Sequence, residues 1–91
     1  MLDKADAIRI AKKLRAEVRK KDNAHDIAEV FHNGLLIAKF GIRRSSRKGI
    51  GHDFIPKEIY ATPHVCKGLA ICTVSRGQWM AMMREKGKIE D

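Results

Sequence analysis

Apolar residues recur every three or four positions in the first part of the chain. Ile10, Leu14 and Val18 fall on one stripe at helical spacing. Asp3 stands just before this stripe and is a residue type that caps helix starts. Basic residues gather at the other end, where the helix dipole favours positive charge. The pattern predicts a long helix over residues 3–21.

The next apolar positions alternate with polar ones around an Asn33-Gly34 dipeptide. Both residues tolerate a positive φ, which makes this pair a strong two-residue hairpin turn signal. We therefore predict a β-hairpin over residues 25–44. The alternative is a helix that begins at Asn23 and ends near Gly34.

The turn also fixes an expected register for the hairpin. The predicted cross-strand pairs are Phe31 with Leu36, Glu29 with Ala38, and Ile27 with Phe40. The side chains expected on the face toward the first helix are Leu36, Ala38, Phe40 and Ile42.

The remainder of the chain predicts one more strand and two helices. A short third strand is expected within residues 52–60, where Pro56 restricts it to an edge or breaks it. Thr62-Pro63 is a helix start that should run to about residue 70 or 71. Ser75 and Gln78 form a capping box for a last helix, which Gly87 ends.

These elements predict a single domain, residues 1–91, of the α+β class with the approximate order α-β-β-β-α-α. A small antiparallel sheet of three strands, two of them the hairpin, should pack on the long N-terminal helix. The chain of 91 residues is too short for a barrel with an outer ring of helices or for a two-domain cofactor enzyme. Its 44% of apolar residues is ordinary for a folded domain.

The net charge of +8 is unevenly distributed. Residues 1–48 carry 13 basic and 6 acidic side chains, whereas residues 49–91 carry 6 and 5. A general solubility charge does not predict this asymmetry, so we expect a polyanionic partner, either DNA or RNA or an acidic protein or nucleoprotein surface. No apolar run approaches the roughly 20 residues of a membrane span, and the first residues do not resemble a signal peptide. We therefore expect a cytoplasmic location and no membrane partner.

The basic residues form two candidate phosphate-binding surfaces. One is the polar face of the predicted helix, with Arg15 at its edge. The other is a basic loop, residues 43–52, in which two serines and two glycines stand among the cations. The alternative for both is a solvated surface without a ligand. The residues predicted to contact phosphates are Arg9, Lys12, Lys13, Arg19, Lys20, Arg43, Arg44, Arg47 and Lys48.

Few aromatic residues remain outside the predicted core to stack on bases. This favours contacts with the phosphate backbone or with duplex shape over the reading of bases. No pair of histidines or cysteines has the spacing of a zinc site, and we expect no metal and no cofactor. Both cysteines, Cys66 and Cys72, are expected to be reduced.

His52 is the one candidate for catalysis. It follows the basic loop, so a neutral imidazole there could act as general base or acid in RNA cleavage through the 2′-hydroxyl. The run Lys48-Gly49-Ile50-Gly51-His52, with the general layout, resembles the HicA-type mRNA interferase toxins. That resemblance implies a fold like that of double-stranded-RNA-binding domains and a strand-borne catalytic histidine. The chain departs from the family because its hairpin precedes the Gly-His element and two helices close the chain.

The last predicted helix carries a cluster of large apolar side chains, Trp79, Met80 and Met83. Core packing is the usual role of such a cluster, and an exposed patch for a partner protein or a homodimer is the alternative. The sequence thus favours a small regulatory, non-enzymatic nucleic-acid-binding protein. The alternatives are a HicA-like ribonuclease that uses His52, and a regulator or inhibitor of the phage or mobile-element type that docks on a larger protein or nucleoprotein complex.

Overall fold

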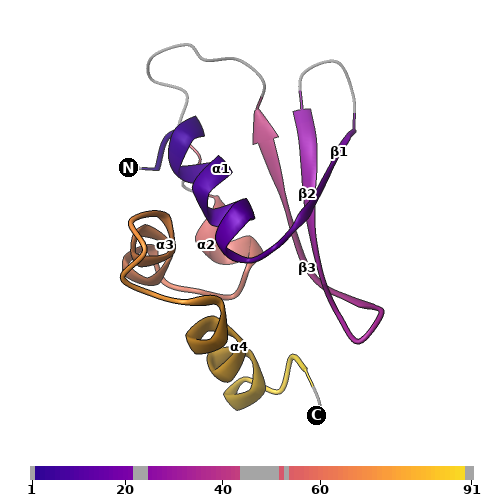
Figure 1. The fold of residues 1–91 in the computed structure, drawn as a ribbon, viewed down its shortest axis with the longest axis vertical. Helices are drawn as coiled ribbons and strands as arrows, with labels where there is room; N and C mark the ends of the chain where they lie inside the picture. The colour runs from indigo at the N-terminus through magenta and orange to yellow at the C-terminus, as the bar shows by residue number, and fades with distance from the viewer. Residues whose placement is uncertain (1, 22–24, 44–51, 53, 90–91) are drawn as a thin grey trace.

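The computed structural model describes residues 2–21, 25–43, 52 and 54–89. Figure 1 shows a three-stranded antiparallel sheet with helices on one side of it, which confirms the α+β class. The elements, in chain order, are α1 (Lys4–Lys13), β1 (Glu17–Lys20), β2 (His25–His32), β3 (Leu35–Arg43), α2 (Ile55–Glu58), α3 (Pro63–Ala70) and α4 (Arg76–Glu85).

Helix α1 begins where the sequence predicts. The Asp3 carboxylate accepts a hydrogen bond from the backbone N–H of Asp6 at 2.8 Å, and the Asp6 carboxylate accepts one from the N–H of Asp3 at 3.2 Å. This reciprocal capping box satisfies two backbone donors that the first turn of a helix leaves without intrahelical partners.

The predicted extent of this helix, residues 3–21, is wrong in its second half. Arg15 adopts a left-handed backbone with φ 55°, so its N–H returns to the Lys12 carbonyl at 3.1 Å. The N–H of Ala16 reaches the Ala11 carbonyl at 2.8 Å, which completes a Schellman motif. The chain leaves the helix there, and residues 17–20 form strand β1 instead.

The sheet therefore has a different third strand from the one predicted. Its order is β1-β2-β3, and β1 pairs antiparallel with β2, with Val18 opposite Ala28. The strand predicted within residues 52–60 is wrong: the short helix α2 lies there. Ile55 and Ile59 are both fully buried, and the Ile59 N–H donates to the Ile55 carbonyl at 3.0 Å, which is the i to i−4 hydrogen bond of a helix.

The hairpin is confirmed, but its register shifts along the strands. Phe31 lies opposite Leu36 as predicted, while the next residue of β2, Val30, pairs with Ala38. Ile37 is thus the extra residue of a β-bulge, which moves every later pair by one position. The remaining predicted pairs are wrong for this reason: Glu29 faces Lys39, and Ile27 faces Gly41.

The face of β3 turned toward the helices is buried as predicted beyond the bulge. Ala38, Phe40 and Ile42 are each at most 6% exposed, and they pack in one core with residues of α1. Leu36, on the other side of the bulge, is 45% exposed. The bulge therefore sets both the register and the end of the buried face.

Helices α3 and α4 begin as predicted. The Thr62 hydroxyl accepts a hydrogen bond from the Val65 N–H at 3.1 Å. In the capping box of α4, the Ser75 hydroxyl accepts from the Gln78 N–H at 3.1 Å, and the Gln78 side-chain oxygen accepts from the Ser75 N–H at 2.8 Å. Gly68 weakens the intrinsic helix propensity of α3, but a Cβ there would lie 2.4 Å from the Val74 side chain. The glycine therefore allows the chain after α3 to fold back closely on the helix.

The apolar cluster of α4 belongs to the core. Trp79, Met80 and Met83 are 1–3% exposed, and the Trp79 indole N–H donates to the Ile59 carbonyl at 3.1 Å. These side chains consequently form no exposed patch, and their prediction as a partner-binding surface is corrected in favour of core packing.

Candidate functional site

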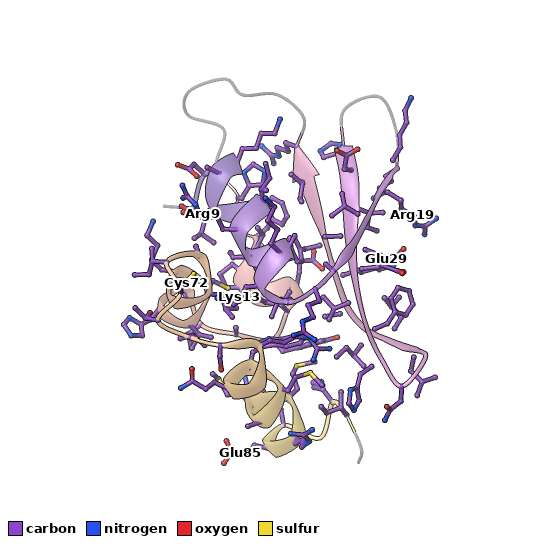
Figure 2. All side chains as sticks on the ribbon, viewed as in Figure 1. Arg9, Lys13, Arg19, Glu29, Cys72 and Glu85 are labelled. Atoms are coloured by element: carbon purple, nitrogen blue, oxygen red, sulfur yellow. The ribbon has the colours of Figure 1, made fainter. Side chains whose placement is uncertain are left out.

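A pocket of about 720 Å³ opens between α1 and the segment that enters α4. Figure 2 shows Arg9, Lys13 and Cys72 on this side of the molecule, where α1 faces α3. None of the described residues that line the pocket is acidic. The cations that line it are Arg9, Lys12, Lys13, Arg15 and Arg76.

Helix α1 supplies three of these cations from one face. Arg9, Lys12 and Lys13 are spaced by three and four residues, which brings their side chains together on the helix surface. Like charges at this spacing repel each other, so the arrangement costs a few tenths of a kcal/mol without a counter-charge. An anion in the pocket would relieve that repulsion.

Arg15 lies on the same rim because of the backbone that ends α1. A left-handed conformation places a Cβ close to the following carbonyl and costs ~1 kcal/mol or more for a residue other than glycine. The Arg15 side chain is exposed and adds a fourth charge to the pocket. The tight helix end therefore carries a cation where a glycine would fit the backbone better.

Arg76 comes from the distant end of the chain and is held in place by two carbonyl groups. Its Nε donates to the Leu14 carbonyl at 3.1 Å, and one terminal nitrogen donates to the Phe31 carbonyl at 3.4 Å. These bonds tie the start of α4 to the end of α1 and fix a guanidinium in the pocket wall. Ser75 and Gly77 of the α4 start also line the pocket, so the positive end of the α4 dipole adds to the side-chain charges.

Asp6, the acidic residue nearest these cations along α1, pairs with Arg9 of the pocket and with Lys67 of α3. Its buried carboxylate lies 3.2 Å from the Lys67 ammonium and 3.5 Å from the Arg9 guanidinium. Burial alone would raise the pKa of Asp6, but the hydrogen bonds from the Asp3 N–H and from Lys67, with the charges of Lys67 and Arg9, hold it below its ordinary value of 3.8. Asp6 is therefore ionised at neutral pH and anchors α1 to α3.

The two cysteines differ in chemistry. Cys66 is fully buried, and burial raises the pKa of its thiol to about 12, so it is inert near neutral pH. Cys72 is exposed, follows α3 with φ 67°, and lines the basic pocket. Both are reduced in this structure, and Cys72 is a natural reporter of what occupies the pocket.

The structure separates the other predicted phosphate contacts from this pocket. Arg19 and Lys20 lie on β1, where Arg19 pairs with Glu29 at 2.6 Å, and that partner raises the pKa of the guanidinium. Figure 2 shows this pair on the far side of the sheet from Arg9. Arg43 ends β3, with its guanidinium 5.8 Å from the centre of the Phe54 ring. Arg44, Arg47 and Lys48 lie outside the described residues.

His52 is a buried histidine and does not lie on a strand. Its side chain is 0% exposed, and its Nε2 accepts a hydrogen bond from the Arg43 N–H at 3.1 Å. Its backbone N–H donates to the Leu2 carbonyl at 2.8 Å, and its ring lies against Phe54. An imidazole in this position joins β3 to the N-terminal segment and offers no exposed atom to a 2′-hydroxyl. The strand-borne position implied by the resemblance is therefore wrong.

No protein-family model, no curated protein and no solved structure matches this chain. Within the described residues, no helix is long and apolar enough to cross a membrane, and no three metal-ligating side chains gather into a cluster.

Proposed function

We propose that the protein binds nucleic acid through the phosphate backbone, with the basic pocket as the point of contact. The observation that carries this proposal is the convergence of five cations and a helix N-terminus on one pocket without an acidic side chain among its described lining residues. Every nucleotide of a nucleic acid carries a phosphodiester charge, and arginine and lysine are the usual ligands of phosphates.

The proposed binding is electrostatic and non-catalytic. Five cations at one pocket would neutralise several phosphates and release their counterions, so affinity should fall steeply with salt. Without base contacts the expected dissociation constant at physiological salt is about 10⁻⁶–10⁻⁴ M. A cytoplasmic location and a regulatory role fit this activity and belong to the same proposal.

The test compares two variants that remove the same charge from different places. Lys12→Ala/Lys13→Ala removes two cations of the pocket, and Lys39→Ala/Lys57→Ala removes two exposed lysines outside it. Alanine favours a helix, so α1 should persist in the pocket variant. Fluorescence anisotropy with labelled DNA and RNA oligonucleotides, measured across a salt series, gives the affinity and its salt slope.

We expect the pocket variant to bind about tenfold or more weakly, with the salt slope reduced by roughly 0.7–0.9 for each lost phosphate contact. The control variant should remain within about twofold of the wild type, because its lysines contact no phosphate. If both variants bind nucleic acid equally weakly, affinity depends on the net charge of the protein and not on the basic pocket. If neither DNA nor RNA binds to the wild type at low salt, the proposal is overturned, and an acidic protein surface becomes the partner to seek.

A further inference from the structure

A second hollow, of about 370 Å³, lies between α1 and β1. Its walls include Ile8, Val18 and Ile42. Ile8 is 39% and Val18 52% exposed, so aliphatic surface is left uncovered here by the residues that the structure describes. We call this hollow the apolar groove.

The apolar groove and the basic pocket lie on adjacent faces of α1, and Lys12 lines both. Ile8 and Lys12 stand one turn apart on the groove side, while Arg9 and Lys13 stand one turn apart on the pocket side. A ligand that crosses the exposed ridge of α1 at Lys12 therefore meets cations on one side and an apolar cleft on the other.

We infer that the apolar groove receives a base of a single-stranded nucleic acid whose phosphates lie in the basic pocket. This inference rests on the proposed function and specifies its ligand. A nucleotide has an anionic phosphate and a flat base with apolar faces, joined by a short sugar, which matches the order of the two surfaces. Lys12 also lines the groove, and its ammonium can donate to the edge of a base or to a phosphate.

The geometry favours a single strand over a duplex. In a duplex the bases are paired and stacked inside, so the backbone can meet the cations but no base can enter a cleft beside them. A single strand is flexible and can turn a base out of its path. No aromatic side chain is among the described residues that line the groove, so a base would be held there by aliphatic contacts and not by ring stacking.

The experiment measures the affinity of the wild-type protein for three probes of equal length, of which the two single strands carry the same phosphate charge and the duplex carries about twice as much. They are a single-stranded 12-mer, the same strand with abasic sites in place of its central bases, and the duplex form. The groove variant is Ile8→Ala/Val18→Ala. Its matched control, Leu35→Ala/Leu36→Ala, removes two exposed aliphatic side chains at the hairpin tip.

The expected result is that the wild type binds the intact single strand about fivefold or more tightly than the abasic strand of equal charge, because a base that enters the groove buries apolar surface. The groove variant should lose that preference and keep its affinity for the duplex, while the Leu35/Leu36 control keeps both. The wild-type comparison of intact and abasic strands does not depend on any variant folding correctly.

Two outcomes separate the failure of this inference from the failure of the proposed function. Equal affinity of the wild type for the intact and the abasic strand would overturn the base-binding groove and leave phosphate binding intact. So would a groove variant that prefers the intact over the abasic strand as strongly as the wild type does. If none of the three probes binds to the wild type, both proposals are overturned.

Discussion

Four residues with a left-handed backbone end the four described helices in the same way. They are Arg15, Tyr60, Cys72 and Gly87, and in each case the N–H of the residue that follows returns to a carbonyl in the last helical turn. Only Gly87 is the residue type that favours this conformation. Of the three non-glycine residues, Arg15 and Cys72 line the basic pocket. Backbone strain of this kind concentrates at functional sites, which agrees with a binding role for the pocket.

At the scale of single residues, we predict that a glycine at position 15 relieves backbone strain but weakens the binding of nucleic acid. Arg15→Gly should be more stable than Arg15→Ala by about 1 kcal/mol, because both variants lose the charge and only glycine relieves the left-handed strain. Both should bind nucleic acid more weakly than the wild type. Urea denaturation and anisotropy of the two variants check these expectations. An alanine variant as stable as the glycine variant would contradict the strain argument.

At the scale of elements, the sequence predicts those starts and turns that depend on neighbouring residues. The Thr62-Pro63 start, the Ser75/Gln78 box and the Asn33-Gly34 turn all operate within four residues, and all are confirmed. The sequence does not predict the end of α1, because Arg15 occupies the left-handed position where a helix end usually has a glycine. Val18 fits the helical spacing of the apolar stripe although it lies beyond the helix, because it belongs to β1.

Helix α2 and the bulge at Ile37 could not be predicted for a different reason. Ile55 and Ile59 suit a strand by residue type, and only their burial against the core selects a helix. Ile37 interrupts the alternation, because Leu35, Leu36, Ile37 and Ala38 are four apolar residues in a row, but such a run does not indicate which residue is the extra one. Both depend on contacts with elements distant in the chain.

The contact between α1 and α3 gives a prediction about pH. Because the pKa of Asp6 is lowered in the folded protein, its ionised form contributes stability that is complete above the unfolded value near 3.8 and is lost as the pH falls through the folded pKa. Asp6→Asn should therefore be about 1–3 kcal/mol less stable at pH 7, with the difference shrinking below about pH 4. Denaturation from pH 7 to pH 2.5 measures this. A constant difference across that range would mean that the Asp6 charge adds nothing to the contact.

At the scale of the whole molecule, the fold changes the composition of the predicted basic surface. The sequence predicts Arg9, Lys12 and Lys13 together, and the structure confirms that they share a face. Arg19 and Lys20 lie on the sheet instead of on this helix face. Arg76 joins the basic pocket, and its side chain donates to the Leu14 carbonyl, 62 residues away in the sequence. No local pattern could indicate that contact, because it depends on how α4 packs against the end of α1.

The central claim is that nucleic acid occupies the basic pocket, and alkylation of Cys72 tests it most directly. Of the two cysteines, Cys72 is exposed in the pocket, whereas Cys66 is buried with a raised thiol pKa, so a maleimide reports on one position. A saturating single-stranded oligonucleotide should slow Cys72 labelling severalfold in the wild type. The Lys12→Ala/Lys13→Ala variant should show much less protection at the same concentration. Labelling at an unchanged rate while anisotropy shows the oligonucleotide bound would contradict the account and place the binding surface elsewhere.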